Sequence, residues 1–255
     1  MVHFILVHGI GHGGWCWDRL AALLTAAGHI VTAPDLSASG FNSKLLDQVH
    51  SASDYFQPLM DVMESLPADA KVILVGHSFG GLGISFAVER FPEKVSVAVF
   101  VTAVMPSPAV PASTIVQEVF SGLDSTMDCT FLFDRGSEKF PSTVIFGPQF
   151  LSSKLYQHSP PEALKLATTL VRPASMFIED ISDQSLLSEK KYGSSNRVYI
   201  VSKKDELMKE EVQRWIISKS SAKEVKEIHG SDHMVMFSKP QELCNSLLQI
   251  AQKYS

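Results

Sequence analysis

The sequence predicts an α/β fold in which a mainly parallel sheet carries helices on both faces. Residues 2–7, 72–75 and 95–101 are near-continuous apolar runs, the pattern of parallel strands buried on both sides. Helix-like stretches separate these runs, which is the rhythm of βαβ units. A chain of 255 residues with 45% hydrophobic residues can fill the core of one large domain.

The other elements follow from the same alternation and from turn residues. Residues 8–14 form a glycine-rich loop between the first strand and the first helix. Gly28 is placed to end that helix, and Pro67 closes the next one. The expected helices are residues 15–27, 53–66, 79–90, 206–219 and 240–254, and the further expected strands are residues 29–33, 197–202 and 225–228.

The alternation stops in residues 106–192, which are rich in proline and scattered aromatic residues. Short amphipathic pieces occur there, notably residues 161–170. We interpret this segment as a cap inserted over the carboxyl edge of the sheet, where open α/β sheets bind ligands. The core then comprises residues 1–105 and 193–255. An independent second domain is the alternative, but no separate set of strands or linker marks one.

Composition narrows the class of protein. The net charge is −5 and no basic patch occurs, which argues against a nucleic-acid partner. No segment approaches the roughly 20 apolar residues of a membrane span, and no leader-like segment opens the chain. The three cysteines, Cys16, Cys129 and Cys244, lack metal-site or paired spacing. We therefore expect a soluble cytoplasmic protein with reduced thiols.

A G-x-S-x-G motif, Gly76 to Gly80, lies between a predicted strand and a predicted helix. In that setting the motif is typical of a nucleophile elbow, in which a tight turn lifts the serine hydroxyl out of the sheet. The flanking glycines avoid clashes with the strand and helix. Ser78 is the predicted nucleophile; a structural serine in a glycine-rich turn is the alternative.

A serine hydroxyl needs a base, and the base needs an acid that orients it. His233 follows the last predicted strand and is the predicted base. His229 is expected to be a structural or surface residue, and His77 is expected to pack or bond locally. Asp205 follows the strand of residues 197–202 and is the predicted acid. Glu206 is its nearest rival, and Asp232 is expected to face solvent.

An oxyanion hole needs two convergent backbone donors. Phe79, directly after the nucleophile, supplies one predicted donor, and Ile10 in the glycine-rich loop supplies the other. A phosphate-binding loop is the competing interpretation of residues 8–14. It is weak because no Lys-Ser/Thr pair follows and the G-x-G-x-x-G spacing is absent.

With the triad placed, the chain resembles the plant methylesterase family of α/β-hydrolases nearly end to end. That family includes the salicylic-acid-binding methyl salicylate esterase, methyl jasmonate esterases and polyneuridine aldehyde esterase. The resemblance rests on V-H-G with H-G-G-W-C-W (7–17), D-L-S-A-S-G (35–40), P-L-M-D-V-M-E-S-L (58–66), V-G-H-S-F-G-G (75–81), F-G-P-Q-F-L (146–151), Y-G-S (192–194) and S-D-H-M (231–234).

The resemblance implies a six-stranded parallel sheet with a helical cap, cofactor-free and metal-free hydrolysis of small carboxylic esters, and often a homodimer. We expect an acyl-enzyme route that releases methanol from the ester of a hydrophobic acid, as in plant specialised metabolism. An acid with a β-oxo or β-aldehyde group would then lose carbon dioxide. The predicted substrate pocket comprises Gly9, His12, Phe131, Phe146, Phe150, Phe177 and Met234; packing within the cap is the alternative for each phenylalanine.

Two other functions remain open. Hydroxynitrile lyases resemble this chain, but they carry Thr where it has Gly9 and Lys where it has Met234. A departing cyanide needs a nearby cation, which a thioether does not supply, so lyase activity is disfavoured. A hydrolase-fold binding protein is the second alternative; such proteins often lose a triad member, whereas all three candidates are present here.

Overall fold

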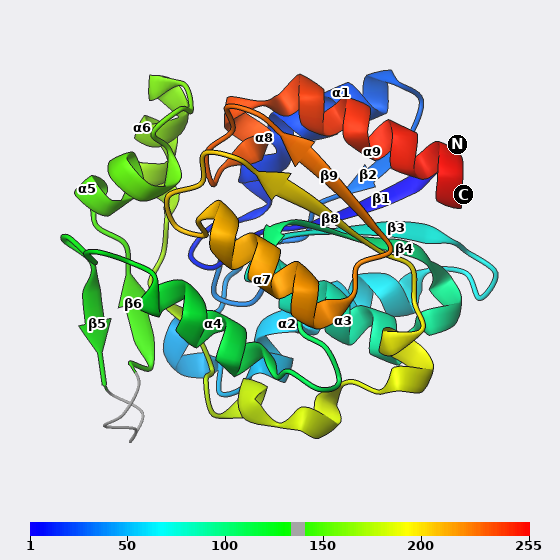
Figure 1. Cartoon of the computed structure of the whole chain (residues 1–255), viewed down its shortest axis with the longest axis horizontal. Helices are drawn as coiled ribbons and strands as arrows, with labels where there is room; N and C mark the ends of the chain where they lie inside the picture. The colour runs from blue at the N-terminus through cyan, green and yellow to red at the C-terminus, as the bar shows by residue number, and fades with distance from the viewer. Residues whose placement is uncertain (134–140) are drawn as a thin grey trace.

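The computed structural model describes residues 1–133 and 141–255, and its centre is a six-stranded sheet. The strand order is β2-β1-β3-β4-β8-β9, and every neighbouring pair is parallel. Figure 1 shows this twisted sheet running through the molecule. Its strands are β1 His3–Val7, β2 Ile30–Thr32, β3 Val72–Ser78, β4 Val95–Ala103, β8 Arg197–Ser202 and β9 Glu224–Ile228. The predicted parallel sheet is confirmed.

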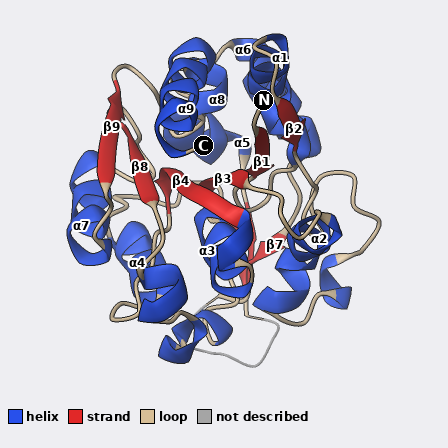
Figure 2. Ribbon diagram, turned by 90° about the vertical axis from the view of Figure 1, so that its right-hand side faces the viewer, coloured by secondary structure: helices blue, strands red, loops and turns tan. Residues whose placement is uncertain are grey.

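Helices cover both faces of the sheet, as Figure 2 shows with the strands seen between two helical layers. One layer contains α1 Asp18–Ala26, α8 Val235–Ser238 and α9 Pro240–Tyr254. The other contains α2 Ala52–Ser65, α3 Gly80–Arg90 and α7 Glu210–Ser220. The central strands β3 and β4 are therefore buried on both sides, which is why their sequences are apolar runs without alternation.

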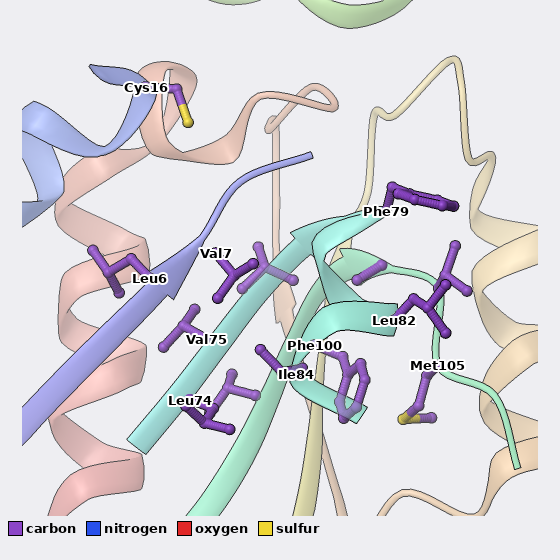
Figure 3. Close-up of a cluster of buried hydrophobic side chains, with 14 of the residues drawn as sticks. Leu6, Val7, Cys16, Leu74, Val75, Phe79, Leu82, Ile84, Phe100 and Met105 are labelled. Carbon is purple, nitrogen blue, oxygen red and sulfur yellow. The ribbon is translucent and has the colours of Figure 1, made fainter. Parts of the chain in front are cut away.

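The core sits between β3 and the helices that follow it. Leu74, Val75 and Phe100 are fully buried, and Figure 3 shows Phe100 beside Ile84 of α3. Burying aliphatic and aromatic side chains of this size contributes about 1.5–3 kcal/mol each. The same packing fixes the direction in which α3 leaves the end of β3, and so fixes the turn between them.

Much of the described part of residues 106–192 lies beside the carboxyl ends of the strands, at the left of Figure 1. Its helices are α4 Ala112–Ser121, α5 Pro148–Phe150 and α6 Pro161–Leu170. Unlike the purely helical cap that we expected, it also contains an antiparallel sheet of β5 Thr130–Leu132, β6 Thr143–Ile145 and β7 Ala174–Ser175. Strands of two or three residues are too short to show an alternating pattern, so the sequence analysis missed them.

Several predicted element boundaries match the observed ones, and others are displaced by a few residues. The predicted bounds of α6, β8 and α9 are those observed. The predicted helix of residues 206–219 begins instead at Glu210, because the Leu207 and Met208 N–H groups donate to the Asp205 carboxylate. Within the described residues, no helix combines the length and apolarity needed to cross a bilayer.

Candidate active site

Ser78 ends β3 at the predicted turn and has a φ of +53°. Two glycines make that turn sterically allowed. A Cβ on Gly76 would lie 2.8 Å from the Gly80 carbonyl oxygen, and one on Gly80 would lie 2.5 Å from the Val7 carbonyl oxygen. A left-handed backbone at a non-glycine residue costs about 1–3 kcal/mol and persists only where the surroundings hold it. The turn therefore has the geometry of a nucleophile elbow.

Asp205 lies in the loop after β8, and its carboxylate is fully buried. Its Oδ1 accepts hydrogen bonds from the Leu207 and Met208 N–H groups, both at 2.8 Å. Its Oδ2 is 2.6 Å from His233 Nδ1. Glu206, the rival acid, is exposed. Asp205 is therefore the carboxylate that meets the histidine.

His233 is 2% exposed in its side chain, and its Nδ1–H donates to Asp205 because an ionised carboxylate can only accept. In the neutral ring this leaves Nε2 unprotonated, the form that a general base needs. The His77 Nε2–H donates to the His233 carbonyl at 2.8 Å, and the two rings lie 4.7 Å apart. Since His77 precedes Ser78, these contacts bring His233 to the elbow.

The Ser78 hydroxyl forms no hydrogen bond to the His233 ring in the described part of the chain. Catalytic hydrogen bonds are often long before substrate binds and tighten in the substrate complex. Asp205 already holds the imidazole on its Nδ1 side.

The loop after β1 approaches Ser78 closely. A Cβ on Gly9 would lie 2.9 Å from Ser78 Cβ and 3.4 Å from Ser78 Oγ, so any larger residue would push the loop away. The Ile10 and Phe79 N–H groups donate to no acceptor among the described residues. Both residues line the same cavity as Ser78, as expected for the two donors of an oxyanion hole.

The cavity beside Ser78 contains about 440 Å³ of space between the atoms, part of it open to solvent. Helix α4 of the cap forms one wall of the cavity, and the loop after β8 that carries Asp205 forms another. No lining residue among those described is charged. The lining residues are Ile10, Ser78, Phe79, Val104, Val116, Val119, Phe120, Phe146, Met176, Leu207 and Met208.

The predicted pocket residues separate into distinct positions. Phe146 lines the cavity. Phe150 stacks behind it with ring centroids 5.5 Å apart, and Phe131 packs edge-on against the lining residue Phe120. Phe177 packs against Tyr55 instead. Two of the four predicted phenylalanines, Phe131 and Phe150, therefore pack behind residues of the cavity wall.

His12 and Met234 also lie outside the cavity surface in the described structure. His12 is buried with its Nδ1 3.0 Å from the Ile10 carbonyl oxygen and its Nε2 2.8 Å from the Tyr156 hydroxyl. It therefore supports the Ile10 loop from behind. Met234 is fully buried, and its N–H donates to the Leu155 carbonyl of the cap.

Asp205 is the only ionised side chain that touches the His233 ring in the described structure. Burial lowers the pKa of His12 to about 4 and the pKa of His77 well below its usual value. Both rings are therefore neutral near pH 7 and add no cation beside Ser78. His229 is 80% exposed in its side chain, as expected for a surface residue.

This geometry agrees with the similarity of the chain to known proteins. The model of the Alpha/beta hydrolase family matches residues 4–246. Methyl jasmonate esterase 1 of Vitis vinifera is 52% identical over 255 residues, which are 99% of this chain and 98% of that protein.

The chain belongs to the alpha/beta hydrolase family.

Solved structures place this alpha/beta hydrolase among plant proteins of the same kind. Tomato methylketone synthase I complexed with 2-tridecanone has a TM-score of 0.93 and 49% identity, covering 100% of this chain and 99% of that one. Polyneuridine aldehyde esterase also has a TM-score of 0.93, with 42% identity and coverage of 98% and 99%. The resemblance to plant methylesterases is confirmed.

Sequence reasoning missed two polar residues of the hydrolase site. Thr102 Oγ1 donates to Asp205 Oδ2 at 2.5 Å. Asp232 is fully buried, not exposed as we expected, and its Oδ2 accepts from the His158 N–H at 2.9 Å and the Ser159 hydroxyl at 2.8 Å. These contacts join residues far apart in the chain, so no local pattern could reveal them. Among the described residues, no group of three or more potential ligands could hold a metal ion.

Proposed function

We propose that this protein hydrolyses the methyl ester of a small hydrophobic carboxylic acid, with Ser78 as nucleophile, His233 as base and Asp205 as the acid that orients it. The observation that carries the proposal is the buried Asp205–His233 pair, 2.6 Å apart, held beside a serine on a strained elbow. Each group has the residue type and burial that its role requires, and the acid and the base are hydrogen-bonded to each other. The esterase names among the relatives support the same reaction class.

The reaction begins when the ester carbonyl enters the cavity beside Ser78. His233 Nε2 takes the hydroxyl proton as Ser78 Oγ attacks the carbonyl carbon, and the carbonyl oxygen becomes an oxyanion. The Ile10 and Phe79 N–H groups stabilise that charge; each such donor is worth about 10²–10³-fold in rate. Asp205 stabilises the imidazolium that forms.

The imidazolium then donates its proton to the leaving methoxide, methanol departs, and the acyl group remains on Ser78. Water attacks the acyl carbon with His233 as base, and the carboxylic acid and free serine result. Every proton is carried by one ring, because Asp205 holds the tautomer in which Nε2 faces the reaction.

The cavity lining supports an apolar acyl group. Val104, Val116, Val119 and Phe120 offer hydrocarbon surface, and Met176 and Met208 add flexible side chains that adapt to shape. The uncharged lining favours a neutral ester over an ionised substrate, and it offers no cation to a departing cyanide. Ester hydrolysis is therefore favoured over cyanohydrin cleavage.

An ester whose acyl chain carries a β-oxo group would undergo a second reaction after hydrolysis. The acid freed by hydrolysis would carry a ketone one carbon away from its carboxylate, and it would lose carbon dioxide readily because the electrons left behind form an enolate. Tomato methylketone synthase I has been solved with beta-ketoheptanoate, which makes this branch a second candidate for the present chain.

The test is a panel of methyl esters of aryl, jasmonoyl, indolyl and alkaloid acids, with methanol and carbon dioxide measured separately. Ser78→Ala should reduce methanol release by about 10⁴–10⁶-fold. Ser85→Ala is the matched control, because it removes a buried hydroxyl from the same strand–helix unit, one that donates to the Gly81 carbonyl and takes no part in the proposed triad. Turnover by Ser78→Ala near that of the control would refute the proposal.

The finer expectations about assembly and location are also proposals. The three cysteines are unpaired thiols, which favours a reducing compartment such as the cytoplasm. A homodimer is proposed from the resemblance, and light scattering during gel filtration tests it.

A further inference from the structure

Thr102 occupies an irregular point in β4. His77 pairs with Val101 and Ser78 pairs with Ala103, so Thr102 is an extra residue without a partner on β3. Its φ is +37°, and its side chain is fully buried. A positive φ is rare for a β-branched residue, and bulges beside active sites often redirect a side chain. The β4 backbone is therefore distorted at Thr102, although strand pairing in the sheet does not require a distortion there.

The distortion directs the Thr102 hydroxyl to the Asp205 carboxylate. Thr102 Oγ1 donates to Asp205 Oδ2 at 2.5 Å, and the same oxygen accepts from His233 Nδ1 at 2.6 Å. The two donors therefore share one oxygen, while Oδ1 is occupied by two backbone N–H groups. With all of its donors in place, the carboxylate cannot rotate away from the ring.

We propose that Thr102 is a positioning residue for the proposed hydrolysis: its bulge holds a hydroxyl on Asp205 Oδ2, which orients the carboxylate and moderates how strongly it binds the His233 ring. This inference rests on the proposed function. The hydroxyl withdraws charge from the oxygen that faces the imidazole, so Asp205 stabilises the imidazolium less than a free carboxylate would.

The electrostatic surroundings of His233 make this effect measurable. The groups that face its ring are Asp205 from the β8 loop, His77 from β3 and His12 from the β1 loop. Asp232 on the same loop directs its carboxylate to the cap at residues 158–159. Burial lowers the pKa of His12 and of His77, so neither is charged at neutral pH. A change at Asp205 Oδ2 is therefore not masked by another charge at the ring.

The direction of the effect follows from this arrangement. Removing the hydroxyl leaves the Asp205 charge concentrated on Oδ2, which strengthens its bond to the imidazolium. The ring then keeps its proton to higher pH and is unavailable as a base over a wider range. A purely structural role for Thr102 would change the amount of folded protein without moving the pH profile.

The experiment measures the rate of Ser78 labelling by a fluorophosphonate between pH 5 and 9, and kcat/KM where an ester is known, for Thr102→Val and Thr102→Ser. In Thr102→Val we expect the acid limb to move up by about half a pH unit and the plateau to fall roughly 10-fold, the scale of one hydrogen bond to a charged group. Thr102→Ser keeps the hydroxyl and should match the wild type. Ser220→Ala, which removes a buried hydroxyl bonded to the Met105 carbonyl, is the matched control.

The proposal is overturned if the Thr102→Val profile overlays the wild type, or if Thr102→Ser moves as far as Thr102→Val. If Thr102→Val does not fold, Thr102→Ala is measured in its place, because it removes the hydroxyl without adding a β-branched side chain. The same two outcomes of the pH profile then overturn the proposal. Labelling of the wild type separates the two claims. Absence of label at Ser78 refutes the proposed function, whereas normal labelling with unmoved variant profiles refutes only the role of Thr102.

Discussion

Replacing Asp205 by asparagine examines the site most sharply, because no orientation of the new amide keeps all four hydrogen bonds in their present directions. Asp205 accepts two hydrogen bonds on each oxygen. If the amide NH₂ takes the Oδ1 position, it faces the Leu207 and Met208 N–H groups, which can only donate. If it takes the Oδ2 position, it faces the Thr102 hydroxyl and His233 Nδ1.

The second orientation is the one we expect, since a hydroxyl and an imidazole can both become acceptors. The His233 ring then accepts at Nδ1 and carries its proton on Nε2, the tautomer that cannot take a proton from Ser78. A triad with the wrong tautomer loses about 10⁴-fold in kcat, or about 5.5 kcal/mol of barrier. The substitution changes the packing little because the aspartate and asparagine side chains have nearly the same shape.

The assay compares kcat for Asp205→Asn and Glu206→Gln on the same methyl ester, with circular dichroism confirming that both are folded. Glu206 is the matched control because it is the adjacent acid and is exposed. We expect a loss of about 10⁴-fold for Asp205→Asn and less than about 2-fold for Glu206→Gln. A folded Asp205→Asn enzyme within tenfold of the wild type would refute this account of the acid.

Two further predictions concern stability. Burial lowers the pKa of both His8 and His12 to about 4 from the usual 6.5, so the unfolded chain binds more protons than the folded chain between those values. The contribution of these rings to the free energy of unfolding is therefore complete above pH 6.5, and it falls by on the order of 3 kcal/mol per ring as the pH decreases toward 4. Urea denaturation measures this change, and a free energy of unfolding that stays constant over this range would contradict the prediction. Asp232→Ala should cost about 2–3 kcal/mol, because the His158 N–H and the Ser159 hydroxyl lose a buried acceptor. Asp232→Asn should cost less than about 1 kcal/mol, since the amide oxygen can replace Oδ2, and equal losses in the two variants would show that the contact contributes nothing.

Local sequence patterns predicted those parts of the fold that depend on local physics. The strands β1, β3 and β4 were recognisable because burial on both faces gives each a near-continuous run of apolar residues. Ser78 was recognisable because the turn around it admits only glycine at Gly76 and Gly80. Asp205 and His233 followed from their places after strands, since the carboxyl ends of parallel strands share one edge of the sheet.

Features that depend on contacts between distant segments were missed or misplaced. Asp232 was expected at the surface, but the cap loop at residues 158–159 covers it. The shifted start of α7 has a local cause instead, because the N–H groups of residues 207–208 donate to the Asp205 carboxylate just before them. Val104, Val116 and Val119 line the cavity, yet nothing in their local sequence separates them from ordinary core residues. Such assignments need the packing of the cap on the core.

The most direct test of the central claim is to identify by peptide mass spectrometry the residue that a fluorophosphonate modifies, and to repeat the measurement in His233→Ala. If Ser78 is the nucleophile and His233 its base, we expect a single modified residue, Ser78, with labelling at least about 100-fold slower when the imidazole is absent. Modification of another residue, or labelling of Ser78 at the same rate in His233→Ala, would contradict it.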